Sequence, residues 1–323
     1  MEKDSVMSGL LHMGLKGLNA VLGRTNLRLV RTSGLSLEQR IQRLAGALEN
    51  VDLRLKSPAC AEHVSWIEAW LVFVKRLSLS HGISFWNEDG DLYAKVEGIT
   101  LHVTSDEELL MMCEVFHDGD YAYEQSGSVI ALDVGMNVGI ASLYLASLPC
   151  VRHVYGFEPF TPTYLAAQRN LALNPELAAR ITAHNWGLGP SEDSLTCRYS
   201  FSRKGNMGPC SKSAFLDACP DTVDQKIEVR RASDQVRRLK DRHPEEGLLL
   251  KLDVEGAEQG ILSDLIAERS IDVVDALAME WHYTDPRQIT KALADCGFGV
   301  QVRGGAFPGA WMVYAVRRSP EAS

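Results

Sequence analysis

The sequence lacks the features that mark several protein classes. Its 323 residues include no apolar run long enough to span a membrane, and a net charge of −9 argues against non-specific binding to nucleic acid. The seven cysteines form no C-x-x-C pair and show no zinc-ligand spacing, which fits a reducing compartment. Composition is otherwise that of an ordinary globular protein. We therefore expect a cytoplasmic α/β protein without stable membrane insertion or a nucleic-acid partner.

A glycine-rich turn is the most informative segment. It reads Asp133-Val134-Gly135-Met136-Asn137-Val138-Gly139, and it lies between an apolar run and a helix-like segment, 140–148. Glycine lets the backbone approach a ligand closely, and a helix start offers free N–H groups and a positive dipole end. Nineteen residues after the turn, a second apolar run ends in Glu158, whose carboxylate suits ribose hydroxyls. The pattern predicts a nucleoside-like cofactor.

The spacing of the glycines favours one such cofactor. The dinucleotide fingerprint is Gly-x-Gly-x-x-Gly, whereas Gly135 and Gly139 are separated by three residues and Asp133 precedes them. An acid at the turn would repel a pyrophosphate but not the sulfonium and ammonium groups of S-adenosylmethionine. The segment thus favours S-adenosylmethionine. A nicotinamide-dependent oxidoreductase and a plain strand–helix connection are the alternatives.

From residue 129 onward, apolar patterns predict alternating strands and helices. The predicted strands are 129–134, 153–158, 181–185, 248–253, 273–280, 298–303 and 311–317, and the helices are 140–148, 162–173, 257–268 and 286–296. Such alternation predicts a mostly parallel sheet with helices on both faces. No helix separates the last two strands, so they are expected to form a terminal antiparallel hairpin. The polar stretch 190–247 is predicted as an insertion with two strands, near 195–199 and 227–230.

The first 80 residues are predicted to be helical. Residues 7–22 are amphipathic, Ser36–Gln39 resembles a capping box, and an apolar stripe with helical spacing then runs from Leu37 to Leu55. Another helix is expected over 60–79. We expect a helical appendage over 1–80 that serves as a homodimer interface or a lid, and a catalytic domain over 81–323. The latter begins with a hairpin, 83–104, that has an Asp-Gly turn, followed by a short helix, 107–116.

A second charged motif follows the strand 248–253. Lys251, Asp253, Glu255 and Glu258 stand close together around Gly256. Ligands of open α/β sheets bind at the carboxyl ends of strands, and charge buried there is costly unless it is paired or used. These charges could instead have a purely structural role. Lys251 could form an ion pair, and Glu258 could stand at a helix start, where the dipole favours an acid. For Asp253 and Glu255 we favour a role in function.

Together the two motifs resemble the FkbM family of S-adenosylmethionine-dependent methyltransferases. The resemblance covers about 83–317 and also rests on four shorter segments: Glu114 to Tyr121, Phe157-Glu158-Pro159, Ala232-Ser233-Asp234 and Glu280-Trp281-His282. It implies a class I methyltransferase fold, which is Rossmann-like with a mostly parallel seven-stranded sheet, and O-methylation of a hydroxyl on a sugar or secondary metabolite. N-methylation of a small-molecule amine and a scaffold without catalysis are the alternatives.

The resemblance also assigns cofactor contacts. Gly135, Asn137 and Gly139 would line the methionine part, with Asp133 near its ammonium, and Glu158 would hold the ribose. The adenine would meet Phe157 or Pro159 on one side and Asn185 and Trp186 on another.

His282 is the predicted general base, because an acceptor hydroxyl must lose a proton and the histidine pKa lies near neutrality. Asp253 and Glu255 are alternative bases or ligands of the acceptor hydroxyl, and Lys251 is a further catalytic candidate. Alternatively, Asp253, Glu255, Glu280 and His282 hold Mg²⁺ or another hard divalent ion, which would lower the hydroxyl pKa.

Two loops are expected to enclose the acceptor. The basic loop 203–208 is a predicted lid, with solvated surface as the alternative. The glycine-rich loop 304–309, between the last two strands, is a predicted wall of the pocket.

Overall fold

A computed structural model describes residues 35–48, 50–55, 60–208, 219, 221–305 and 309–318. The predicted amphipathic helix at 7–22 lies outside these residues. No helix in the described part combines the length and the apolar character needed to cross a bilayer. The homodimer or lid role of residues 1–80 and the cytoplasmic location stay predictions.

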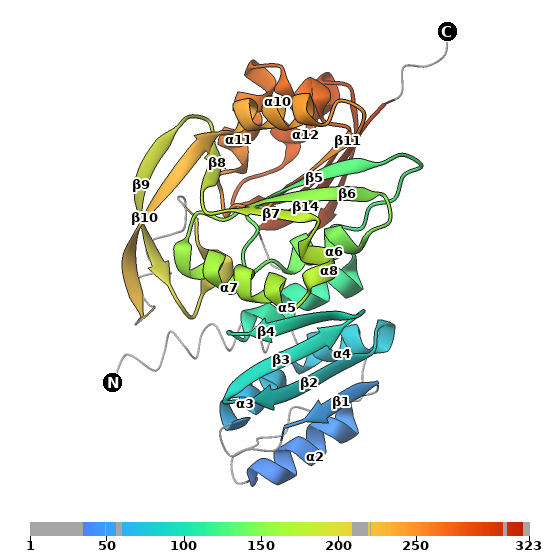
Figure 1. Cartoon of the computed structure of the whole chain (residues 1–323), viewed down its shortest axis with the longest axis vertical. Coiled ribbons are helices and arrows are strands. Elements are labelled where there is room, and N and C mark those ends of the chain that lie inside the picture. The colour runs from blue at the N-terminus through green and yellow to red at the C-terminus, as the bar shows by residue number, and fades with distance from the viewer. Residues whose placement is uncertain are drawn as a thin grey trace. The chain divides into compact units, whose positions relative to one another are not determined.

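A seven-stranded sheet forms the centre of the catalytic domain (Figure 1). Its order is β13 (Phe298–Gly304), β14 (Ala310–Arg317), β12 (Ala276–His282), β11 (Gly247–Leu252), β5 (Val129–Val134), β6 (Val151–Phe157) and β7 (Ile181–His184). All pairings from β12 to β7 are parallel, while β14 is antiparallel to both of its neighbours. The predicted class I methyltransferase architecture, with its terminal antiparallel hairpin, is confirmed.

Helices cover both faces of this sheet, as predicted. In Figure 1, α10 (Ala232–Arg242), α11 (Glu258–Ala267) and α12 (Arg287–Asp295) lie over one face. The other face carries α6 (Ile140–Ser147), α7 (Thr161–Ala172) and the short α8 (Pro175–Ala178). Because both faces are covered, β5 is buried at every position, in agreement with a sequence that is apolar except at Asp133.

The predicted insertion is shorter than 190–247. Strands β9 (Asp193–Ser200) and β10 (Thr222–Arg231) form an antiparallel arm, and β10 also pairs in parallel with β8 (Gly187–Gly189). The rest of the stretch is α10, the helix that leads into β11. Sequence reasoning missed α10 because its apolar buried face is narrow, with Val236 and Leu239 set among charged residues.

The N-terminal part is not purely helical. The capping box is confirmed, since Ser36 Oγ accepts from Gln39 N at 3.2 Å and Gln39 Oε1 accepts from Ser36 N at 2.8 Å. However, α2 (Leu37–Ala47) ends before the apolar stripe does, and β1 (Val51–Arg54) is a strand. The predicted helix over 60–79 is two helices, α3 (Ala61–Ala69) and α4 (Leu71–Ser80). Tertiary pairing overrides the helical periodicity at β1.

A second sheet joins the two sides of the boundary predicted at residue 80. Its order is β1, β2 (Ile83–Glu88), β3 (Asp91–Val96) and β4 (Ile99–Val103). The Asp-Gly turn is confirmed, since Asp89 and Gly90 both have positive φ. After this sheet, α5 (Glu107–Met112) continues into a π-helical turn, η2 (Cys113–Asp118), which carries Glu114.

Candidate functional site

The glycine turn after β5 packs against the loop after β11. Gly135 has a φ of +83°, and a Cβ placed there would lie 1.7 Å from the carbonyl oxygen of Asp253. Any side chain at this position would therefore push the two loops apart. The glycines of the turn predict that a ligand can approach the backbone. At Gly135, it is the backbone of the second charged motif that approaches closely.

A buried ion pair fastens the same two loops. Lys251 Nζ lies 2.9 Å from Asp133 Oδ1 and donates to the Gly135 carbonyl at 2.6 Å. Ser142 Oγ donates to Asp133 Oδ2 at 2.5 Å. Only 3% of the Lys251 side chain is exposed, and that of Asp133 is fully buried. Burial lowers the pKa of Lys251, but the charges of Asp133 and Asp253 outweigh this and raise it.

These contacts give both residues a structural role. Asp133 faces Lys251 and Ser142, and so fixes the turn. Lys251 lies between Asp133 and Asp253 and holds the two loops together. The predicted cofactor contact of Asp133 and the predicted catalytic role of Lys251 stay predictions.

Glu158 lies beside the turn, at the end of β6, where the sequence predicted it. Its Oε2 accepts from Asn137 N at 3.0 Å and its Oε1 accepts from Phe160 N at 2.9 Å. Burial raises its pKa to about 7, against the opposing effect of these two backbone hydrogen bonds. The carboxylate thus links the turn to the next loop.

The residues predicted to flank the adenine have structural contacts. Phe157 is only 1% exposed and stacks on His184 at 5.1 Å within the core. The Trp186 ring stacks on His184, with the ring centres 4.2 Å apart, and the Arg230 guanidinium lies 3.6 Å from its centre. Asn185 donates to the Glu158 carbonyl at 3.0 Å. These contacts give Phe157 and Trp186 a packing role and let Asn185 position the loop of Glu158, while their predicted contacts with the adenine stay predictions.

Acidic groups and one histidine gather where β11 and β12 end. Asp253 and Glu255 follow β11, whereas β12 extends past its predicted end and carries both Glu280 and His282. Residues two apart in a strand point to the same face, and His282 Nε2 lies 3.8 Å from Glu280 Oε1 and 3.7 Å from Glu255 Oε1. The structure thus brings together the residues that the metal alternative named.

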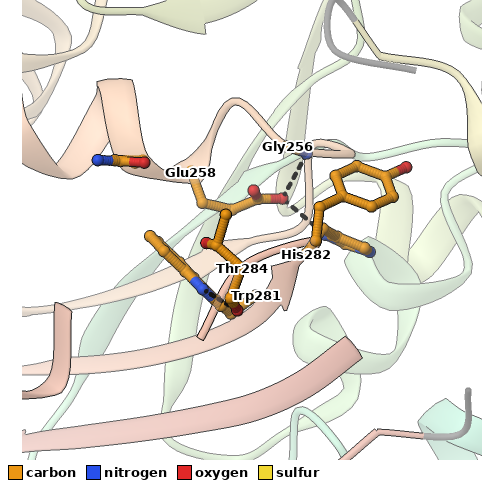
Figure 2. A pocket seen from close by; sticks show the side chains of 7 residues that line it. Gly256, Glu258, Trp281, His282 and Thr284 are labelled. Atoms are coloured by element: carbon orange, nitrogen blue, oxygen red, sulfur yellow. Dashed lines mark hydrogen bonds and ion pairs between the residues drawn. The ribbon is translucent and has the colours of Figure 1, made fainter. Parts of the chain in front are cut away.

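Glu258 holds His282 from the other side (Figure 2). Its Oε1 lies 2.8 Å from His282 Nδ1 and accepts from Val254 N and Gly256 N at 3.2 and 3.1 Å. The carboxylate is buried at the start of α11, where the helix dipole favours a negative charge. Glu258 therefore orients the imidazole ring.

The surroundings of His282 favour the protonated ring. Burial alone would lower its pKa, but the hydrogen bond with Glu258 and the nearby charges of Glu255, Asp253 and Glu280 raise it to about 10. The role of His282 as the general base stays a prediction. Burial raises the pKa of Glu255 to about 7 and that of Glu280 to about 8.

Sequence reasoning missed two residues of this cluster. Burial, followed by the charge of Glu280, raises the pKa of Glu114 well above its usual range. Tyr121 Oη donates to Asp253 Oδ2 at 3.2 Å, and Lys251 Nζ lies 5.2 Å from the centre of its ring. Both belong to the segment Glu114 to Tyr121 that carries the family resemblance, which was the signal available.

A pocket of about 260 Å³ opens beside His282 (Figure 2). It is lined by Gly256, Glu258, Gln259 and residues 281–284. None of the residues predicted to bind the cofactor lines it. The pocket therefore adjoins the acid cluster and is separate from the glycine turn.

The loop 203–208 is anchored at both ends. Lys204 Nζ lies 3.3 Å from Glu108 Oε1, and Gly205 N donates to Glu107 Oε2 at 3.2 Å. At the other end, a Cβ on Gly208 would lie 2.6 Å from Glu255 Cβ and 2.8 Å from the Glu255 carbonyl oxygen. The predicted lid is thus a strap between α5 and the Glu255 turn. Of the predicted wall at 304–309, residues 306–308 lie outside the described part.

Comparison with known proteins identifies the domain. The sequence profile described as "Methyltransferase FkbM domain" matches residues 133–300, more than half of the chain. The chain belongs to the FkbM family of methyltransferases. Its enzyme class is therefore that of S-adenosylmethionine-dependent methyltransferases, and the nicotinamide-dependent alternative is set aside.

Two fungal proteins are among the relatives of this FkbM chain. It is 31% identical to "Methyltransferase sdnD" of Sordaria araneosa, over 58% of this chain and 80% of the relative. It is 28% identical to "Methyltransferase 1" of Beauveria bassiana, over 46% of this chain and 63% of the relative. A solved methyltransferase FkbM from Methylobacillus flagellatus has a TM-score of 0.43 and 16% identity, over 85% of this chain and 58% of that one. The structural likeness at that level adds nothing to the assignment.

Replacing Lys251 by methionine should destabilise the protein strongly. Asp133 would remain buried without its partner, which costs about 3–5 kcal/mol. Urea unfolding of both proteins measures the difference. Arg269→Ala, which breaks an exposed pair with Asp272, should leave stability nearly unchanged. Equal midpoints for Lys251→Met and the parent protein would contradict the structural role of the pair.

Replacing Gly208 by alanine should impair methyl transfer, because the new Cβ displaces Glu255. A shift of about 1 Å at a catalytic group costs on the order of 10²-fold in rate. The matched control is Gly82→Ala, since nothing lies within 4 Å of a Cβ at Gly82. Turnover and S-adenosylhomocysteine affinity are compared in the two variants. Full activity of Gly208→Ala would show that the strap does not position Glu255.

Proposed function

We propose that the enzyme transfers the methyl group of S-adenosylmethionine to a hydroxyl of a small molecule. The observation that carries this proposal is the contact between the glycine turn and the acid cluster. Gly135 packs on the Asp253 carbonyl, and Lys251 contacts both Asp133 and Asp253. A cofactor bound at the turn would therefore lie next to the carboxylates that follow β11.

For this reaction the protein must mainly position the two reactants and remove one proton from the acceptor. The sulfonium already activates the methyl group, and good orientation supplies roughly 7–11 kcal/mol. A hydroxyl is a poor nucleophile until it loses its proton. Glu255 and Glu280 place carboxylates beside the pocket residue His282. The proton would pass to a carboxylate there or leave with the help of a bound divalent ion.

One relative supports a small-molecule acceptor. The chain is 27% identical to part of "AMB antimetabolite synthetase AmbE" of Pseudomonas aeruginosa, covering 10% of that protein, whose name refers to the synthesis of an antimetabolite. N-methylation of an amine is the second candidate, because the acid cluster would attract a protonated amine. A protonated amine has no free electron pair, so it would have to lose a proton at the same carboxylates.

Replacing Glu158 by glutamine should weaken cofactor binding. The neutral amide would replace the carboxylate that is expected to accept hydrogen bonds from the ribose hydroxyls. Loss of one hydrogen bond to a charged group costs about 1.5–3 kcal/mol, or roughly 10- to 100-fold in affinity. Calorimetric titration with S-adenosylhomocysteine measures this. Glu176→Gln, an exposed change on α8, is the control and should bind as the parent does. Unchanged affinity of Glu158→Gln would remove Glu158 from the cofactor site.

Product analysis tests the acceptor class. Purified enzyme is incubated with S-adenosylmethionine carrying a labelled methyl group, and with sugars and phenols paired with amines of the same shape. We expect labelled methyl ethers, identified by mass spectrometry. Labelled methylamines alone would overturn the assignment to oxygen.

A further inference from the structure

Asp253, Glu255 and His282 each direct one metal-binding atom to a common point. These three atoms lie within 4.8 Å of one another. We propose that these residues form a binding site for a divalent ion of the Mg²⁺ and Mn²⁺ class, which holds the acceptor oxygen. The catalytic part of this inference rests on the proposed function, whereas the binding part stands by itself.

His282 is arranged as a metal ligand. Its side chain is only 9% exposed, and Nδ1 is engaged by Glu258 at 2.8 Å. Nε2 points to the cluster, and within the described residues it makes no hydrogen bond, since the nearest carboxylate oxygens lie at 3.7 and 3.8 Å. A metal-bound histidine almost always donates its other N–H to a carboxylate or carbonyl, which fixes the ring. Glu258 fills that role, because two backbone N–H groups hold it in place.

The two carboxylates also have outer partners. Tyr121 donates to Asp253 Oδ2 at 3.2 Å, and Tyr283 donates to Glu255 Oε2 at 2.7 Å. Each acid therefore keeps its other oxygen for an ion. Glu255 and Tyr283 both have left-handed backbone conformations, with φ of +52° and +66°. Such conformations are costly in residues other than glycine and cluster at ligand clamps.

The donor set suits a cation. Lys251, the lysine that contacts Asp253, lies closer to Asp133, at 2.9 Å against 3.6 Å, and so leaves Asp253 available to an ion. The donors are oxygens and one imidazole, with no thiolate, which suits Mg²⁺ or Mn²⁺. On binding, the ion would replace the proton on Nε2, and that proton would leave to solvent.

The ion would act on the acceptor hydroxyl. A hydroxyl bound to a divalent ion is more acidic, so its proton leaves to solvent. The oxygen then forms its bond to the methyl carbon while the carbon–sulfur bond breaks and its electron pair stays on sulfur. The products are a methyl ether and neutral S-adenosylhomocysteine, and no further reactant is needed.

Direct Mn²⁺ binding tests the site independently of catalysis. The full-length protein is treated with chelator, desalted and titrated with Mn²⁺, with free Mn²⁺ followed by electron paramagnetic resonance. We expect one saturable site per chain, weakened at least about tenfold in Asp253→Asn and His282→Ala and about 10- to 100-fold in Glu258→Gln. The matched control is His81→Ala, whose histidine pairs with Glu97 outside the cluster and should leave binding unchanged.

Several outcomes would overturn the inference: no saturable Mn²⁺ binding, parent-like affinity in His282→Ala, or equal weakening in His81→Ala. S-adenosylhomocysteine titration of each variant separates loss of the site from loss of the fold. Methyl ether formation that persists in chelator would refute the metal's catalytic role and leave the proposed function intact. Mn²⁺ binding without a methyl ether from any acceptor would refute the proposed function and leave the ion site intact.

Discussion

The buried ion pair of Lys251 and Asp133 is the interaction on which the site depends. The two residues are directly opposite each other in β11 and β5, the central strands of the sheet. Taking both charges out of water costs several kcal/mol for each ion, and only close geometry offsets that cost. With Gly135 packed on the Asp253 carbonyl, the pair holds the glycine turn against the acidic loop that follows β11. The two halves of the site therefore cannot shift independently.

The proposed function also predicts a preference for substrate over product. S-adenosylmethionine carries one more positive charge than S-adenosylhomocysteine, because methyl transfer removes the sulfonium charge. An ionised carboxylate near the methyl group would stabilise the charged cofactor more than the neutral product. Lys251 and His282, which lie beside the acids, would reduce this effect.

The sequence could predict the features that depend on local sequence pattern, but not those that depend on contacts formed only in the folded protein. The central strands were predictable because burial on both faces leaves continuous apolar runs, and motifs at strand ends were predictable because parallel strands end at one edge. Periodicity could not show that Asn50, with a φ of +57°, precedes a strand instead of continuing a helix. It also could not separate core-facing Phe157 from a ligand-facing aromatic. The pKa of His282 depends on carboxylates from residues 253–280, whose distances exist only after folding.

Part of the surroundings of the acid cluster comes from outside the family match. That match spans residues 133–300, whereas Glu114 and Tyr121 precede it and still reach the acid cluster. The strap ending at Gly208 connects the same preceding segment, through α5, to the Glu255 turn. Changes in these parts would alter the surroundings of the acceptor while leaving the Lys251–Asp133 pair in place. Acceptor choice is therefore expected to reside in α5, η2 and the strap, and methyl transfer itself in the loops that the ion pair holds.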